Sequence, residues 1–282
     1  MPPPGGRRSQ LADVPASGSW DSYFYPHPDS GTLRNLFDER DPDVLGRLEY
    51  VEAVERHREL LAGEVAIART YDRDHIRAIH HHLFQDVYPW AGQYRTVNIS
   101  KGVVGNFADV TTGEIDRYLT DVHQFVVSTE WGGLDHGDFV EQAAVIFAYL
   151  NQAHPFREGN GRTSKVFMDH VAEQSRFEFD YARVSPEVWN QCSMLSGPDA
   201  YDYPPHPDLL VPVFDQITVR REEPPTTAVE ETRAQEVGKP TERTRYRSRD
   251  YPHPPSAANA IRYRRAQPAP DRDRGPTRAP KL

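Results

Sequence analysis

The chain has 282 residues, 25 of them proline, with a formal net charge of −9 and a mean hydropathy of −0.73. Its length accommodates one or two domains, and its low hydropathy indicates that part of it cannot bury enough apolar surface to fold. The apolar run at residues 143–150 is far shorter than the ~18 residues that a membrane helix requires, so we expect no membrane-spanning segment.

The cysteine content and the N-terminal sequence bear on the cellular compartment. Cys192 is the single cysteine, which excludes an internal disulfide and fits a reducing cytoplasm. Arg7 and Arg8 are not followed by an apolar stretch, so the first residues do not predict a secretory signal. We therefore expect a cytoplasmic protein.

Apolar residues recur at helical spacing over most of the region between residues 43 and 220. Residues 93–107 are the exception, since their alternating pattern predicts a short β-hairpin. The expected fold class is therefore mostly α, with one small hairpin. The expected helices comprise residues 43–63, 73–86, a segment capped by Thr111 or Thr112 that ends at Val127, 138–153 and 162–176, with shorter ones near 185–195 and 205–220.

The segment between the two long helices, residues 154–165, reads HPFREGNGRTSK. The N–H groups of a Gly-Asn-Gly turn are uncovered, and the following helix adds the positive end of its dipole, so the turn can hold phosphate oxygens. Glu158 is placed to ligate a magnesium ion that bridges phosphates. His154 can take a proton from an incoming hydroxyl. Together with Arg162, these groups indicate nucleotide transfer.

Other interpretations of the glycine-rich turn fit less well. A P-loop requires glycine directly before its lysine, but Ser164 precedes Lys165. The dinucleotide-binding fingerprint requires a strand before the glycines, whereas the residues before His154 follow a helical pattern. A surface turn that caps a helix would explain Gly-Asn-Gly alone, but not the His, Phe, acid and Arg at these offsets.

The segment resembles the signature of Fic proteins, His-Pro-Phe-x-[Asp/Glu]-Gly-Asn-Gly-Arg-x-x-Arg, at every position except the last, where Lys165 replaces arginine. The resemblance extends in the same order over about residues 22–215. It includes residues 25–26, 32–35, 79–80, 83–92 and 94–102.

Fic proteins of the Gly-Asn-Gly type mostly transfer AMP from ATP to a Ser, Thr or Tyr hydroxyl of a target protein and release pyrophosphate. The resemblance implies that His154 is the general base and that Glu158 positions Mg²⁺ between the α- and β-phosphates. It also implies an anion hole and a hairpin flap that holds the target by strand pairing. The anion hole corresponds to the N–H groups of Gly159, Asn160 and Gly161, and Arg162 lies against the β-phosphate. In the flap region, Lys101 and Gly102 are expected to contact the nucleotide. The residues of the flap expected to bind the target are Ile99, Ser100 and Phe107.

The departure at Lys165 bears on the nucleotide donor. In the family the arginine at this position grips the γ-phosphate bidentately, whereas lysine offers only a point charge. A Fic enzyme with another donor, such as one that moves UMP, GMP or a phosphoryl group, therefore stays open, although the kinase-like branch has Ala-Asn-Lys-Arg where this chain has Gly-Asn-Gly-Arg. A catalytically weak Fic fold that acts as a binding module is the third hypothesis.

Charge divides the chain into two parts. Residues 239–282 contain 12 Lys and Arg against four Asp and Glu, a net +8, which leaves −17 for residues 1–238. A segment so poor in apolar residues is predicted to be disordered. It could bind nucleic acid through Arg and interleaved Tyr, serve as a tether or export signal, or be dispensable. We expect a disordered N-terminus at 1–20, a Fic domain at 21–220 and a disordered Pro/Arg-rich tail at 221–282.

The sequence lacks the inhibitory motif that many Fic proteins carry, and this suggests regulation by a separate protein. Many Fic proteins carry an inhibitory helix, [Ser/Thr]-x-x-x-Glu-[Gly/Asn], whose glutamate pairs with the second motif arginine. This sequence has no match, because Thr226 and Glu230 have the spacing but Glu231 follows. The resulting hypothesis is a small antitoxin that supplies the glutamate, and residues 25–26 and 33–35 resemble the branch regulated in this way.

Four further polar features suggest mostly structural roles. His80, His81 and His82 are adjacent on a helix and point apart, so they cannot converge on a metal. His80 resembles a family position that packs inside the domain. Asp169 and His170 are expected to form a surface pair. Arg95 and Asn98 either face the nucleotide or belong to the flap.

Overall fold

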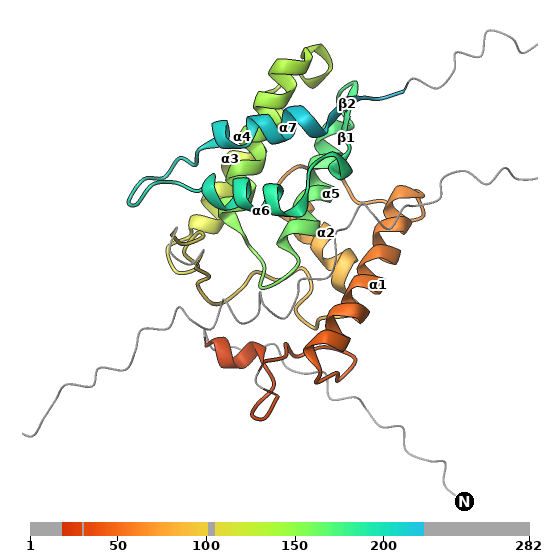
Figure 1. Ribbon diagram of the computed structural model, residues 1–282, viewed down its shortest axis with the longest axis vertical. Coiled ribbons are helices and arrows are strands. Elements are labelled where there is room, and N and C mark those ends of the chain that lie inside the picture. The colour runs from red at the N-terminus through yellow and green to blue at the C-terminus, as the bar shows by residue number, and fades with distance from the viewer. Residues whose placement is uncertain (1–18, 30, 101–104, 223–282) are drawn as a thin grey trace, which may run out of the picture.

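The apolar segment before the glycine-rich turn forms the central helix, α4 (His136–Ala153). The computed structural model, which describes residues 19–29, 31–100 and 105–222, packs α4 against α3 (Glu114–Ser128), α5 (Asn160–Ala172) and α7 (Val211–Ile217) (Figure 1). Buried side chains occur on successive residues of α4, including Phe139, Val140 and residues 146–148. A helix that is apolar on nearly all sides belongs in the middle of the core.

A second layer of helices positions the glycine-rich turn from the other side. α2 (Arg73–Phe84) contacts α5 and α1 (Pro42–Leu61), and α1 lies at the edge of the domain (Figure 1). Both helices begin at an aspartate whose carboxylate accepts two main-chain N–H groups, Asp41 for α1 and Asp72 for α2. The other elements are α6 (Pro186–Leu195) and the 3-10 helices η1 (Trp20–Tyr23), η3 (Trp131–Gly133), η4 (Tyr181–Arg183) and η5 (Pro207–Leu209).

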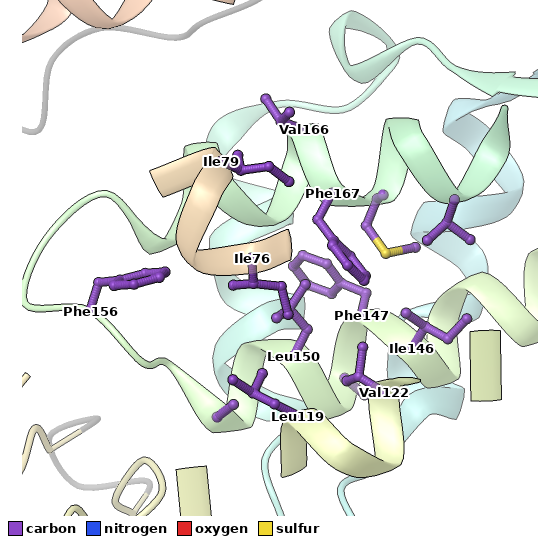
Figure 2. Close-up of a cluster of buried hydrophobic side chains, with 14 of the residues drawn as sticks. Ile76, Ile79, Leu119, Val122, Ile146, Phe147, Leu150, Phe156, Val166 and Phe167 are labelled. Atoms are coloured by element: carbon purple, nitrogen blue, oxygen red, sulfur yellow. The ribbon is translucent and has the colours of Figure 1, made fainter. Parts of the chain in front are cut away.

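One apolar cluster joins the helices that flank the turn. Figure 2 shows side chains from α2, α3, α4 and α5 in contact around Phe147 and Phe167, with Phe156 projecting from the α4–α5 loop. Phe156 is fully buried. The loop is therefore anchored to the core by its own aromatic ring as well as by the helices on either side.

The predicted helices exist, but several of their ends differ. α3 begins after Gly113, which has a left-handed backbone and no capping side chain, so neither Thr111 nor Thr112 is the N-cap. α5 ends at Ala172 rather than at residue 176. Residues 218–220, expected to be helical, form strand β2 (Thr218–Arg220), which pairs antiparallel with β1 (Phe177–Phe179). This pairing was missed because the two three-residue strands lie about forty positions apart in the sequence and neither shows a pattern by itself.

The predicted hairpin at 93–107 is confirmed in a reduced form. Its described antiparallel contacts are a bridge between Ser100 and Asn106 and a hydrogen bond from the Phe107 N–H to the Ile99 carbonyl of 3.1 Å. The terminal segments expected to be disordered lie almost wholly outside the described residues. Across the ranges that the structure describes, no helix combines the length and the apolar character needed to cross a membrane.

His170 is buried against α2, so the expected surface pair of Asp169 and His170 is wrong. His75 Nδ1 accepts the Tyr71 N–H at 3.2 Å, so His75 carries its hydrogen on Nε2 and donates it to His170 Nδ1 at 2.9 Å. Burial lowers the pKa of His75 to about 4 and that of His170 to about 2. A proton on either acceptor nitrogen would also face another N–H group, so both rings are held neutral.

The stability of the fold should depend on pH through His170. The unfolded chain binds a proton there below its ordinary pKa near 6.5 and the folded chain does not, so this histidine destabilises the fold as the pH falls through that value. Between pH 7.5 and 5.5 the free energy of unfolding of His170→Gln should fall by about 1 kcal/mol less than that of the wild type, measured by urea denaturation. An equal pH dependence in His170→Gln and in the wild type would contradict the assignment.

Candidate active site

Two residues with left-handed backbone bracket the α4–α5 loop. His154 ends α4 with φ 39° and ψ 57°, and Gly159 precedes α5 with φ 82°. The conformation costs a non-glycine residue about 1–2 kcal/mol, so the contacts around His154 must hold it there. The two turns let α5 begin beside the end of α4.

The shape of the loop is fixed by side chains that bind its main chain. Asn160 Oδ1 accepts the Phe156 N–H at 2.9 Å, and Asn160 Nδ2 donates to the Phe156 carbonyl at 2.8 Å. On the other side, His80 Nδ1 accepts the Gly92 N–H at 2.8 Å, so its Nε2 carries the hydrogen and donates to the Glu158 carbonyl at 3.0 Å. The side chain of Asn160 therefore has a structural task, and only its N–H is available to a ligand.

The start of α5 has main-chain N–H groups that could bind an anion. Gly159 offers no capping side chain, and the N–H groups of the first helical turn have no acceptor within the helix. The Gly159 N–H itself donates to Glu158 Oε1 at 3.0 Å. An anion at this helix start would therefore meet the N–H groups of residues 160–162, one position later than the sequence predicts.

Glu49, on α1, contacts the motif arginine and was not predicted as a site residue. Arg162 donates to Glu49 Oε1, and Tyr88 donates its hydroxyl hydrogen to Glu49 Oε2. All three side chains are buried or nearly so. One signal was available: Leu45, Glu49 and Ala53 recur at intervals of four on the buried face of α1, so Glu49 is a charge at a core position.

Glu158 lies in an environment that disfavours its charge. Burial, followed by the nearby Glu49 carboxylate, raises the pKa of Glu158, while Arg162 and Arg157 act in the opposite direction. Arg157 is in turn held with its guanidinium carbon 4.4 Å from the centre of the Trp20 ring. A divalent cation would relieve the repulsion between the two carboxylates, so the electrostatics fit a magnesium ligand at Glu158.

The side chain of Lys165 packs against two aromatic rings. Its ammonium nitrogen lies 4.6 Å from the centre of the Tyr181 ring and 5.0 Å from that of Trp189. One helical turn later, burial raises the pKa of Asp169 to about 8, although a Tyr181 hydrogen bond and the Lys165 charge oppose the shift.

The flap lies against His154. The rings of Phe107 and His154 stack with centroids 3.7 Å apart and an angle of 18°. Ile99 is 2% exposed and Ser100 is half-buried, so the predicted target-binding residues differ in accessibility. Lys101 and Gly102, predicted to contact the nucleotide, lie outside the described residues.

Comparison with known sequences gives the family. Residues 70–172 match the Fic/DOC family. The chain is 32% identical over 165 residues to "Probable protein adenylyltransferase y4lH" of Sinorhizobium fredii, which covers 57% of this chain and 81% of that protein. The chain therefore belongs to the Fic/DOC family.

The similarity to other relatives is partial. "Protein adenylyltransferase VbhT" of Bartonella schoenbuchensis is 36% identical over 173 residues, but the match spans only 35% of that protein. Among solved structures, the BepC protein of Bartonella tribocorum with bound AMPPNP has a TM-score of 0.59 and 22% identity, and covers 72% of this chain and 98% of that one. At this identity the structural match establishes the fold.

Gly159 should tolerate no side chain. A Cβ there would lie 2.4 Å from Phe84 Cε2, and its φ of +82° disfavours any other residue. Gly159→Ala should lower the free energy of unfolding by about 2–4 kcal/mol, measured by urea denaturation. Gly161→Ala is the matched control, because a Cβ there meets nothing within 4 Å; this change should be neutral or stabilise α5 by about 0.5–1 kcal/mol. Equal effects would contradict this packing.

Glu49 should matter for stability more than an exposed glutamate of the same helix. Glu49→Gln removes the charge that faces the buried Arg162, and breaking a buried pair costs about 3–5 kcal/mol. In the control Glu55→Gln, the lost partner is Arg58 in an exposed pair, with an expected cost below about 0.5 kcal/mol. Thermal and urea unfolding of both variants measure the difference; similar losses would show that Glu49 and Arg162 do not form a stable pair.

Proposed function

We propose that the chain is a protein adenylyltransferase that moves AMP from ATP to a Ser, Thr or Tyr hydroxyl of a target protein and releases pyrophosphate. The observation that carries this proposal is the α4–α5 junction, where a histidine, an anion-binding helix start and a buried acid–arginine pair meet. The names of the relatives support it.

The residues of the junction have distinct roles in this reaction. His154 accepts the proton of the target hydroxyl, whose oxygen then forms a bond to the α-phosphorus as the bond to pyrophosphate breaks. The N–H groups of residues 160–162 and the Arg162 guanidinium receive the charge on the phosphates. Because Arg162 is already oriented by Glu49, it does not have to be ordered when the nucleotide arrives.

Magnesium, where bound, would neutralise phosphate charge, and Glu158 is the residue that would hold it. Within the described parts of the chain, no group of three or more His, Cys, Asp or Glu side chains gathers in a form that could hold a metal by itself. This fits the usual habit of Mg²⁺, which binds to one or two carboxylates together with substrate phosphates.

A different nucleotide donor is the second candidate. The ammonium of Lys165 rests on Tyr181 and Trp189, so the contact to a γ-phosphate is weaker than an arginine fork would give. A donor with another base, such as UTP or GTP, therefore stays a second candidate. Regulation by a separate antitoxin stays a proposal, for which co-purification of a small protein with the intact chain is the test.

Replacement of His154 should slow transfer strongly without removing nucleotide binding. We expect His154→Ala to lower the rate of AMP transfer by about 10²–10⁴-fold, the contribution of a positioned general base. The assay incubates purified chain, cell lysate and Mg²⁺ with ATP labelled on either the α- or the γ-phosphate. Protein label from the α-position alone supports the proposal; label from the γ-position indicates a kinase-like reaction, and no label from ATP leads to the same assay with UTP, GTP and CTP.

If His154→Ala labels protein as fast as the wild type, the proposed role of the histidine is wrong. If no labelled nucleotide modifies any lysate protein, the chain is a binding module rather than a transferase. The assay uses lysates from several organisms, so that a target missing from one cell type can still be present in another.

A further inference from the structure

Arg95 connects the flap to the residue proposed as the base. The residue is 2% exposed, and its guanidinium donates to carbonyls of three separate residues: Nε to His154 at 2.8 Å, Nη1 to Val97 at 2.8 Å, and Nη2 to Ala108. The Arg95 N–H also donates to the Pro155 carbonyl at 2.8 Å. Arg95 therefore joins Val97 and Ala108, on the two sides of the flap, to His154 and Pro155 at the start of the α4–α5 loop.

A buried charge without an acidic partner requires an explanation. The ion pairs recorded for the described residues do not include Arg95, and its guanidinium hydrogen bonds go to carbonyl oxygens. Burial lowers the pKa of Arg95 to about 10, and the charge of Asp109 opposes this shift. Burying a cation is unfavourable unless its donors are satisfied. The planar guanidinium of Arg95 can donate to three carbonyls at once, and these hydrogen bonds offset the cost of burying its charge.

The contacts of Arg95 act on the conformation of His154. The carbonyl that receives Nε belongs to His154, whose left-handed backbone has to be held by its surroundings. The carbonyl that receives Nη2 belongs to Ala108, next to the ring of Phe107 that stacks on His154. On the far side, the Ala108 N–H donates to the Gln152 carbonyl at 3.0 Å, which ties the same flap segment to the end of α4.

We propose that Arg95 is a positioning residue that sets the backbone of His154 and seats the flap ring of Phe107 on the imidazole. This inference rests on the proposed function, since it assigns Arg95 an effect on proton transfer by His154. The nucleotide site is built independently: the loop is closed by Asn160, and Arg162 is oriented by Glu49. Loss of Arg95 should therefore affect the chemical step rather than binding of the donor.

The main test compares Arg95→Lys with Arg176→Lys. Arg176 is an exposed arginine outside the motif that also donates to a main-chain carbonyl, that of Leu134 at 2.7 Å. Lysine has a single nitrogen and cannot reach three diverging carbonyls. We expect Arg95→Lys to lower kcat by about 10–100-fold while KM for ATP changes less than about twofold, and Arg176→Lys to leave both unchanged.

A second readout does not depend on transfer. Phe107 covers the His154 ring, so diethyl pyrocarbonate should modify His154 several times faster in Arg95→Lys than in the wild type, as followed by peptide mass spectrometry. Exposed His81 and His136 serve as internal references. If the wild type transfers no nucleotide, the proposed function fails, and this reaction rate still decides whether Arg95 positions His154.

A general loss of stability has to be separated from positioning. Val122→Ala removes fully buried methyl groups from α3 and supplies a destabilised variant with the site intact. An equal fall of kcat in Val122→Ala at matched loss of melting temperature would overturn the proposal. So would an unchanged kcat and an unchanged rate of His154 modification in Arg95→Lys.

Discussion

The two hydrogen bonds between the Asn160 carboxamide and the main chain of Phe156 close the loop on which the candidate site depends. They join Phe156, two residues before Glu158, to the first residue of α5, so the helix start and the loop form one unit. The ring of Phe156 then fixes that unit to the core, where it stacks on His80 with centroids 3.8 Å apart. A rigid helix start is what makes an anion site effective, because its N–H groups need no reorganisation.

Buried arginines are charged near the α4–α5 loop, but buried histidines are neutral at the contact between α2 and α5. Near the loop, charged groups are retained and satisfied: Arg162 by Glu49, and Arg95 by three carbonyls. At the α2–α5 contact, His75 and His170 are instead neutral and hydrogen-bonded to each other. Keeping a charge buried is costly, so the retention of Arg162 with Glu49 beside the loop is what perturbed, functional sites commonly show.

The helical fold was largely predictable because its helices carry regular apolar patterns and clear interruptions. The motif residues were predictable as a set, since their types and offsets are local in the sequence. Arg95 and Glu49 were not assigned, because their partners lie far along the chain: His154 is 59 residues from Arg95, and Arg162 is 113 residues from Glu49. The β1–β2 pair was missed for the same reason.

The sequence by itself determined the family, the order of the helices and the loop that holds His154, Glu158 and Arg162, since each depends on residues within one or two turns of one another. The tertiary structure decided that the Gly159 N–H is bonded to Glu158, that Glu49 is the acid that pairs with Arg162, and that Arg95 donates to the His154 carbonyl. Those outcomes depend on the contacts that α1, α2 and the segment around Arg95 make with the loop. These contacts form where segments distant in the chain pack together, so no local sequence pattern predicts them.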